Sequence, residues 1–377
     1  MKIVIAPDSF KESLTALEAS LAIENGMKKI FPEAEFIKVP MADGGEGTVQ
    51  SLVDATGGKI ISKTVTGPLG DPAEAFFGIS GDESTAVIEM AAASGIHLVP
   101  AEKRNPLITS TRGTGELIAA ALDYGVKRII IGIGGSATND GGAGMAKALG
   151  IKLLDASGEE IAEGGGSLRS LARIDVSRAD ARLASVKIEV ACDVDNPLTG
   201  PRGASAIFGP QKGATPLMVK ELDDNLHHFA AIIRRDLGKD IEPIPGAGAA
   251  GGLGGGLLAF LSAELKRGVD IVIEATRLEE HIQDADFVIT GEGKIDGQTI
   301  FGKTPIGVAK TAKKHQVPVI AIAGNVSPDS HVVHEHGIDA VFSIVPGVVT
   351  LANAFENANI YVERLSTNIA SVIKLSK

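Results

Sequence analysis

The chain has 377 residues, of which 44% are hydrophobic and 22% charged, as in an ordinary globular protein with room for two domains. Its formal net charge is −11, and it has no Trp, two Tyr and 4% aromatic residues. This composition excludes a typical nucleic-acid-binding surface, which needs clustered cations and stacking rings, and favours a small-molecule ligand.

Three features indicate a cytoplasmic protein without a membrane partner. The first ten residues, MKIVIAPDSF, turn polar too soon for a signal peptide. The single Cys192 excludes an intramolecular disulfide, and we expect it to be a buried, unreactive thiol. Residues 243–263 are uncharged and nearly long enough to span a bilayer, but they are rich in Gly and Pro. We expect a Gly-rich loop there, followed by a short buried helix.

The first predicted elements are a strand, a helix and a second strand. Residues 2–8 (KIVIAPD) and 35–43 (EFIKVPMAD) are apolar runs typical of buried parallel strands. Between them, residues 13–31 repeat apolar side chains at helical spacing, and Ser13 is the expected N-cap.

The middle of the chain has a different pattern. Residues 58–79 predict two strands joined by a turn at Gly-Pro and Asp-Pro, and residues 85–91 predict a third strand. A strand, a Gly-rich loop and a helix follow around Gly132. Further strands are predicted over residues 151–155, 187–193, 286–293, 318–325 and 340–347.

This order predicts an α/β fold with two domains. An open parallel-sheet, Rossmann-like domain is built from both termini, residues 1–60 and 281–377. A mixed α/β domain, residues 61–280, is inserted between its halves. We expect the ligand in an interdomain cleft.

The stretch GIGGSATNDGGAG, residues 132–144, formally matches a dinucleotide-binding fingerprint. Gly132, Gly134 and Ala137 have the required spacing, and Asp155 follows at the position of a ribose-binding acid. Such a turn needs its helix to begin near the second Gly, whereas Asn139 and the residues after it predict a later start. We therefore favour a ligand-binding loop of another kind.

A second formal match, to the P-loop motif, lies in GQTIFGKT, residues 297–304. A true P-loop begins its helix directly behind the strand, but here the predicted strand ends several residues before Gly297. Pro305 indicates the first helical position, with Thr304 as the N-cap. The spacing is therefore fortuitous, although Lys303 remains a candidate phosphate contact.

Four Gly-rich loops have the composition of anion sites: MADGGEGT, GIGGSATNDGGAG, PGAGAAGGLGGG and GEGKIDGQTIFGK. Gly at this density allows backbone N–H groups to converge on anionic oxygens. Acidic residues lie nearby, because Asp8, Asp43 and Asp193 each follow a predicted strand, where open α/β sheets bind ligands. Carboxylates beside Gly-rich loops and Lys residues match the needs of phosphoryl transfer.

Six motifs in order resemble the bacterial class I glycerate kinases: DSFKESLTA, MADGGEGT, IGIGGSATNDGGAGMAKALG, ACDVDNPLTGPRGA, FGPQKGA and GEGKIDGQTIFGKTPIGVA. They extend over most of the chain. The resemblance implies a two-domain α/β enzyme that phosphorylates D-glycerate with ATP and Mg²⁺. It leaves open which hydroxyl is phosphorylated, the 2- or the 3-hydroxyl, and also the oligomeric state.

The expected site combines these residues. Asp193 or Asp43 is the candidate base and Lys11 a catalytic cation. Asp195, Glu292 and Asp296, in what we expect to be similar loops, are the candidate Mg²⁺ ligands. The candidate substrate and phosphate contacts are Asp8, Ser9, Gly44, Gly45, Glu46, Gly134, Gly135, Ser136, Asn139, Asp140, Asn196, Lys212 and Lys303.

Two other classes of function stay open at this point. An NAD-dependent oxidoreductase is suggested by the fingerprint at Gly132, and a non-catalytic sensor would bind a sugar acid in the cleft. Turnover of ATP with D-glycerate would distinguish a kinase from a sensor, and titration with NADH would test the oxidoreductase.

Overall fold

The computed structural model describes residues 1–375, and its main strands form two separate sheets. The chain divides into two compact units. The first unit contains residues 1–43, 50–57 and the chain from Val269 onward, and the second contains residues 44–49 and 58–268. Residues 269–280, which we expected in the inserted segment, thus belong to the first unit. These two units are defined by compactness, and the domain boundaries expected at residues 60 and 280 remain a prediction.

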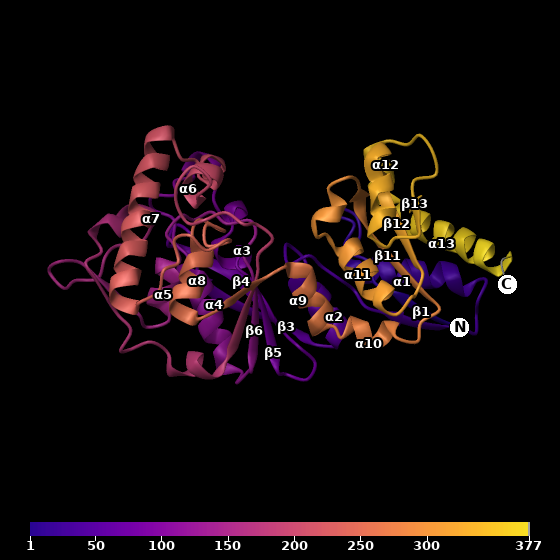
Figure 1. Ribbon diagram of the computed structural model, residues 1–377, viewed down its shortest axis with the longest axis horizontal. Coiled ribbons are helices and arrows are strands. Elements are labelled where there is room, and N and C mark those ends of the chain that lie inside the picture. Colours follow the sequence, from indigo (N-terminus) through magenta and orange to yellow (C-terminus); the bar gives the residue numbers. More distant parts are fainter. Residues whose placement is uncertain (376–377) are drawn as a thin grey trace. The chain divides into compact units, whose positions relative to one another are not determined.

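The first unit has a five-stranded parallel sheet in the order β13-β12-β11-β1-β2 (Figure 1). The chain runs outward from β1 to β2 on one side and from β11 through β12 to β13 on the other. The order therefore reverses between β1 and β11, which is the switch point where open α/β sheets bind ligands. The strands are β1 (Lys2–Ile5), β2 (Glu35–Lys38), β11 (Phe287–Ile295), β12 (Val319–Val326) and β13 (Ala340–Ser343).

Two helices, α1 (Ala16–Lys28) and α13 (Ala358–Leu375), pack on each other and share a core with this sheet. Ile3, Ile23 and Val362 are fully buried in that core. Helix α11 (Thr304–Lys314) contacts β11 and β12. The remaining helices are α2 (Thr48–Thr56), α9 (Gly268–Ala275), α10 (Leu278–Ile282) and α12 (Leu351–Glu356), with short 3₁₀ segments η6 (Thr299–Phe301) and η7 (Pro328–His336).

The N-cap of α1 is Thr15, not Ser13 as expected. Thr15 Oγ1 accepts a bond from the Glu18 amide at 3.1 Å, and the Thr15 amide donates to Glu18 Oε2 at 2.8 Å. This reciprocal pair is a capping box. The Ser13 hydroxyl instead donates to the Phe10 carbonyl at 3.1 Å and closes the turn after β1.

The second unit has a six-stranded mixed sheet in the order β10-β9-β6-β5-β4-β3. The predicted pair of strands is β3 (Lys59–Thr66) and β4 (Pro72–Ile79), and the antiparallel part continues into β5 (Thr85–Glu89). The other strands are parallel: β6 (Arg128–Gly132), β9 (Lys187–Ala191) and β10 (Glu264–Lys266). The predicted strand at residues 151–155 lies outside this sheet, because β7 (Lys152–Leu154) pairs with β8 (Arg173–Asp175).

Two apolar cores stabilise the second unit. One lies between the sheet, α4 (Arg112–Asp123) and α8 (Leu253–Leu261), and includes Phe77 and Leu117. The other involves α5 (Ala143–Ala148) and α7 (Pro216–Leu237), and includes Phe229. Short segments complete the unit: α3 (Ala91–Ser94), η1 (Ile96–Leu98), η2 (Ala101–Lys103), η3 (Gly165–Ser170), η4 (Ala181–Ser185), α6 (Ala204–Phe208) and η5 (Pro210–Lys212).

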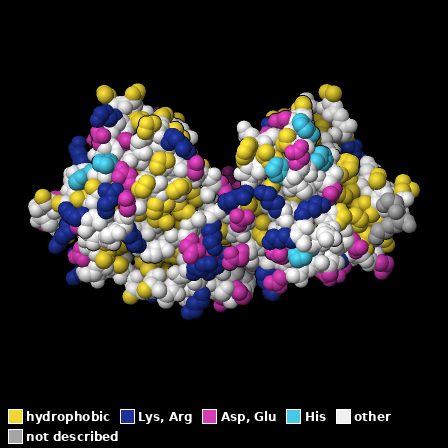
Figure 2. Space-filling view, viewed as in Figure 1, with side chains coloured by type: hydrophobic (Ala, Val, Ile, Leu, Met, Phe, Trp, Pro, Cys, Tyr) yellow, Lys and Arg dark blue, Asp and Glu magenta, His cyan; other side chains and the backbone are white. Residues whose placement is uncertain are grey.

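The Gly-rich stretch before residue 253 forms a loop that leads into the buried helix α8, as predicted. Within residues 1–375, none of the helices has both the length and the apolar content required to cross a membrane. On the face shown in Figure 2, Lys and Arg side chains lie among Asp and Glu side chains in each unit. Pairs such as Lys59–Glu83 and Lys220–Asp224, both at 2.6 Å, contribute to this mixed surface.

Candidate active site

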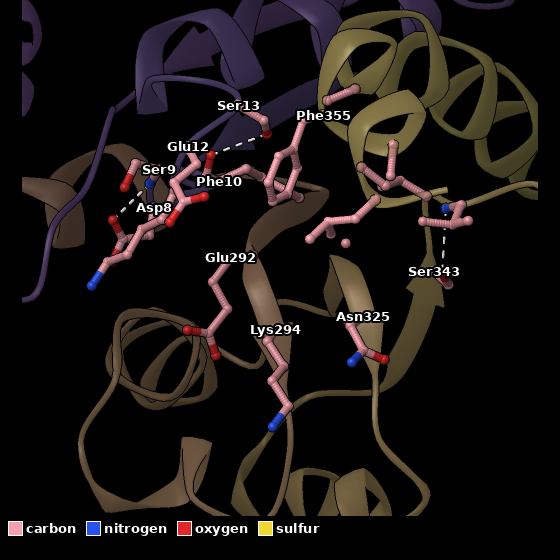
Figure 3. A pocket seen from close by; sticks show the side chains of 18 of the residues that line it. Asp8, Ser9, Phe10, Glu12, Ser13, Glu292, Lys294, Asn325, Ser343 and Phe355 are labelled. Carbon is pink, nitrogen blue, oxygen red and sulfur yellow. Dashed lines mark hydrogen bonds between the residues drawn. The ribbon is translucent and has the colours of Figure 1, made fainter. Parts of the chain in front are cut away.

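The switch point of the first sheet carries a pocket with a volume of about 920 Å³. Asp8 follows β1, and its amide donates to the carbonyl of Gly291 in β11 at 2.8 Å. Glu292 is therefore beside the end of β1, although it is far away in sequence. The pocket is lined on this side by the predicted site residues Asp8, Ser9, Lys11, Asp43, Glu292 and Lys303. Asp8, Ser9 and Glu292 are labelled in Figure 3.

Asp8 is held by two short hydrogen bonds. Thr304 Oγ1 donates to Asp8 Oδ2 at 2.6 Å, and the Ser9 amide donates to Asp8 Oδ1 at 2.6 Å. Even so, the pKa of Asp8 is raised to about 6, chiefly because burial disfavours its charge and secondly because Asp43 repels it. Two of the predicted carboxylates are thus electrostatically coupled.

Glu292 lies within strand β11 and not in a loop as expected, because β11 continues to Ile295. The extension is stabilised by parallel pairing with β12, which includes Glu292 opposite Ala323. Thr299 Oγ1 donates to Glu292 Oε1 at 3.0 Å, and Lys303 Nζ lies 3.5 Å from Glu292 Oε2. Burial is the main cause that raises the pKa of Glu292 to about 7, and Asp8 raises it further.

Lys303 and Thr304 stand at the start of α11. Lys303 is the N-cap, Thr304 the first helical residue and Pro305 the second, so the helix begins one position earlier than expected. Since Thr304 does not cap the helix, its hydroxyl is available to bond Asp8. Asp296 does not line the pocket; it forms a 2.9 Å ion pair with Lys294 and accepts a bond from the Gln298 amide.

In the second unit, the Gly-rich loop between β6 and α5 is organised by a fully buried carboxylate, Asp140. It accepts bonds from the amide and hydroxyl of Thr111 at 2.9 and 2.8 Å and from the amides of Gly142 and Gly144 at 3.1 Å. Burial raises the pKa of Asp140 above its usual value. Its contacts are thus with the chain itself, which holds the loop against the start of α4.

A buried lysine supports the same loop. Lys212 is 1% exposed, and its Nζ donates to Ser136 Oγ and the Thr138 carbonyl, both at 2.6 Å. Burial lowers the pKa of Lys212 to about 7. Asn139 donates to Ser205 Oγ at 3.0 Å. In contrast, Gly134 and Gly135 are exposed at the tip of the loop.

The motif MADGGEGT is divided between the units, with Asp43 in the first and Gly44, Gly45 and Glu46 in the second. Gly44 has a φ of +91°, and a Cβ there would lie 2.5 Å from the Ala191 side chain at the end of β9. Only Gly can make this close approach. Nearby, the Val49 amide at the start of α2 donates to Glu89 at 2.9 Å.

Three predicted residues follow β9. Asp193 Oδ1 accepts a bond from the Gly268 amide at 3.2 Å. Asp195 is exposed and pairs with Arg202 at 2.8 Å, and Asn196 donates to the Arg202 carbonyl at 2.8 Å. The predicted metal ligands therefore fall in two units, Asp195 in the second and Glu292 with Asp296 in the first. Over residues 1–375, no three His, Cys, Asp or Glu side chains form a group that could hold a metal ion.

The dinucleotide alternative is wrong. Helix α5 begins at Ala143, eleven positions after Gly132 at the end of β6, so its N-terminus does not follow the tight turn that a pyrophosphate requires. Asp155 does not serve as a ribose-binding acid, because it accepts bonds from the amide and hydroxyl of Ser157 and closes a turn.

Two residues that contact the site were missed in the sequence, Thr304 and Thr299, which bond Asp8 and Glu292. The two Thr residues stand in the motif that supplied Lys303, so hydroxyls beside a predicted charged residue were the available signal.

Coupled, buried carboxylates beside a lysine at the switch point of a parallel sheet define an α/β enzyme acting on a charged small molecule. The chain belongs to the glycerate kinase family, whose model matches residues 3–374. It is 67% identical over 377 residues to the glycerate kinase of Bacillus subtilis (strain 168), covering 100% of this chain and 99% of that one.

Two other relatives are also named glycerate kinases. The glycerate 2-kinase of Escherichia coli (strain K12) is 60% identical over 375 residues, with 100% of this chain and 98% of that protein covered. A crystal structure from Salmonella typhimurium LT2, provisionally named glycerate kinase 2, matches with a TM-score of 0.93 and 56% identity, covering 100% of this chain and 99% of that one. The protein is thus an enzyme of the glycerate kinase type.

Proposed function

We propose that the protein transfers the γ-phosphate of ATP to D-glycerate. The observation that carries this proposal is the meeting of Asp8, Glu292 and Lys303 in one pocket, in a chain of the glycerate kinase family. The Escherichia coli relative is named a glycerate 2-kinase, which favours the 2-hydroxyl as acceptor and 2-phosphoglycerate as product. The cytoplasmic location proposed with it rests on the sequence features given above.

Phosphoryl transfer depends on positioning and charge stabilisation, and the chain has groups for both. Lys11 and Lys303 line the pocket and supply cations for phosphate oxygens. In the second unit, the exposed Gly134 and Gly135, followed by Ser136 with its bond from Lys212, have the composition of a phosphate loop. The substrate contacts proposed for Ser9, Gly44, Gly45, Glu46, Asn139, Asp140 and Asn196 rest on their positions in the same motifs.

The pocket also suits Mg²⁺. This ion prefers oxygen ligands and commonly binds through one or two carboxylates together with substrate phosphates. Asp8 and Asp43 repel each other, and Asp8 also repels Glu292. A bound cation would reduce this electrostatic repulsion and so stabilise the folded state. Asp8 and Glu292 would hold the ion. The sequence also proposes Asp296, outside this pocket, and Asp195 of the second unit as Mg²⁺ ligands. Bound Mg²⁺ would supply positive charge that neutralises the phosphate oxygens of the nucleotide.

The acceptor hydroxyl needs a base, for which Asp43 and Asp193 are the candidates. Asp43 lines the pocket of the first unit beside Asp8. Asp193 is an exposed carboxylate directly after β9 in the second unit. Either would accept the hydroxyl proton as the oxygen attacks phosphorus.

The test is steady-state turnover of ATP with D-glycerate, with the product identified by ³¹P NMR. We expect 2-phosphoglycerate from the wild-type protein. Asn in place of the base should lower kcat by about 10²–10⁴-fold. The exposed Asp82→Asn variant of the second unit is the control. If Asp43→Asn and Asp193→Asn both keep wild-type kcat, neither residue is the base. A wild-type protein without phosphoryl transfer to glycerate would overturn the proposed function itself.

A further inference from the structure

The pocket at the switch point has an apolar half that phosphate chemistry does not use. Its apolar lining consists of Phe10, Ile344, Val345, Val349, Leu351 and Phe355. Phe10 and Ile344 are only 2% and 3% exposed and form its base, whereas Leu351 is 69% exposed at its rim. In Figure 3 the Phe355 ring projects from α12 toward the side of the pocket that carries Glu292.

This apolar wall is a fixed part of the first unit. The Ile344 amide donates to the Ala323 carbonyl at 2.9 Å, which continues the pairing of β13 with β12. Helix α12 is capped by Thr350, whose Oγ1 accepts a bond from the Asn353 amide at 3.2 Å. The Tyr361 hydroxyl donates to Asn353 Oδ1 at 2.7 Å and ties α12 to α13. Phe355 is therefore presented on an anchored helix.

The size of the pocket indicates the larger of the two reactants. At about 920 Å³ it lies in the upper range of small-molecule sites, and a three-carbon acid would leave most of it empty. A ligand that fills it must carry charge at one end, for Lys303 and the carboxylates, and a flat apolar group at the other. A nucleoside triphosphate has this distribution, and glycerate does not.

We propose that the apolar half of this pocket is the nucleobase subsite, with the base of the phosphate donor stacked on Phe355. This assignment rests on the proposed function, since it takes the donor to be a nucleoside triphosphate. Phe355 is half-buried, and over residues 1–375 the ring pairs are Phe77–Tyr124 and Phe229–Phe260, so no other ring covers its face. An available aromatic face binds a base by stacking. The triphosphate then extends toward Asp8, Glu292 and Lys303.

Calorimetric titration with ATP and with inorganic tripolyphosphate tests the subsite, because tripolyphosphate lacks the base. We expect Phe355→Ala to raise the Kd of ATP by about 5- to 100-fold and to leave the Kd of tripolyphosphate unchanged. Leu351→Ser should raise the Kd of ATP in the same direction. Phe76→Ala, which removes a ring that is 37% exposed in the second unit, is the matched control and should change neither affinity.

Unchanged ATP affinity in both variants would overturn the subsite, and so would an equal loss of ATP and tripolyphosphate. A rise in the KM for glycerate with an unaltered KM for ATP would overturn it too, by assigning the pocket to the acceptor. Leu351 is so exposed that its replacement carries the test even if Phe355→Ala lowers the melting temperature. The titrations need no turnover, so a wild-type protein that binds ATP but does not phosphorylate glycerate contradicts only the proposed function.

Discussion

At the scale of single residues, the pocket of the first unit contains buried carboxylates whose negative charge is unfavourable. Asp8 and Glu292 have pKa values raised to about 6 and 7, mainly by burial; Asp43 raises the pKa of Asp8 further, and Asp8 raises that of Glu292. A carboxyl with a raised pKa binds its proton more tightly in the folded state than in the unfolded state. Stability then falls as pH rises from the unfolded to the folded pKa, and the full cost is present above the folded value.

Glu292→Gln should therefore stabilise the protein without ligand at high pH only. The cost of the Glu292 charge develops between pH 4.5 and about 7, so we expect the variant to gain about 1–3 kcal/mol at pH 8 and nothing at pH 4. Denaturant unfolding at both pH values measures this, with the exposed Glu83→Gln as the control. A gain of equal size at both pH values, or a loss at pH 8, would contradict the electrostatic cause.

At the scale of elements, the loop between β6 and α5 combines a buried base with an exposed tip. Asp140 and Lys212 hold the base through short hydrogen bonds inside the second unit. Gly251, from the other Gly-rich loop, packs on it so closely that a Cβ would lie 1.9 Å from the Thr138 carbonyl oxygen. The Gly residues of these loops thus serve two different purposes, close packing at the base and an open backbone at the tip.

The Gly134→Ala variant distinguishes two roles for this loop, phosphate binding by its backbone and formation of a tight turn. An added Cβ meets nothing within 4 Å and the φ at this position is not positive, so we expect a stability change below about 1 kcal/mol. If the backbone binds a phosphate, the methyl group should still raise the KM for ATP or lower kcat about 10-fold or more. Gly135 is a poorer probe, because its φ of +73° would strain any side chain.

Melting temperature and kinetics are measured together for this loop. Gly251→Ala introduces a clash at a position with a φ of +68°, so its free energy of unfolding should fall by about 2 kcal/mol or more. This variant is the control for a change that damages packing. A Gly134→Ala protein with wild-type kinetics would remove the tip of the loop from the site.

At the scale of the whole molecule, each unit has its own sheet and packs around apolar cores of its own, so a ligand can stabilise one unit more than the other. The charge stored at Asp8 and Glu292 lies in the first unit. A cation bound there favours the folded state by the linkage relation, which amounts to about 2.7 kcal/mol at a ligand concentration of 100 times Kd.

Mg²⁺ with ATP should therefore raise the melting temperature, and more so at pH 8 than at pH 5.5. At the lower pH, Asp8 and Glu292 are largely protonated and must lose protons before they bind the ion. Calorimetry with and without Mg²⁺-ATP measures the shift, and Asp8→Asn should remove most of it. An undiminished shift in that variant would show that the ion binds elsewhere.

The amino-acid sequence by itself determined the local elements and the family. Apolar runs predicted the strands of both sheets except β10, and the placement of Asp8 after β1 and Asp193 after β9 followed from where those runs end. Local patterns suffice for this, because strand propensity, helical spacing and turn residues act over a few neighbouring positions. The six ordered motifs were enough to indicate a glycerate kinase.

Only the tertiary structure decided which of these residues meet. Thr304 bonds Asp8 across 296 positions of sequence, and Glu292 stands beside them because β11 pairs with β1 and extends along β12. Burial is likewise a property of the whole fold, so neither the raised pKa of Glu292 nor the buried Lys212 was visible in the motifs. No pattern in the sequence indicated the apolar half of the pocket. Phe10 and Phe355 resemble ordinary apolar residues in the sequence, and only the fold brings them to one pocket. Pairing energies between distant strands decide such contacts, and no short stretch of sequence contains both partners.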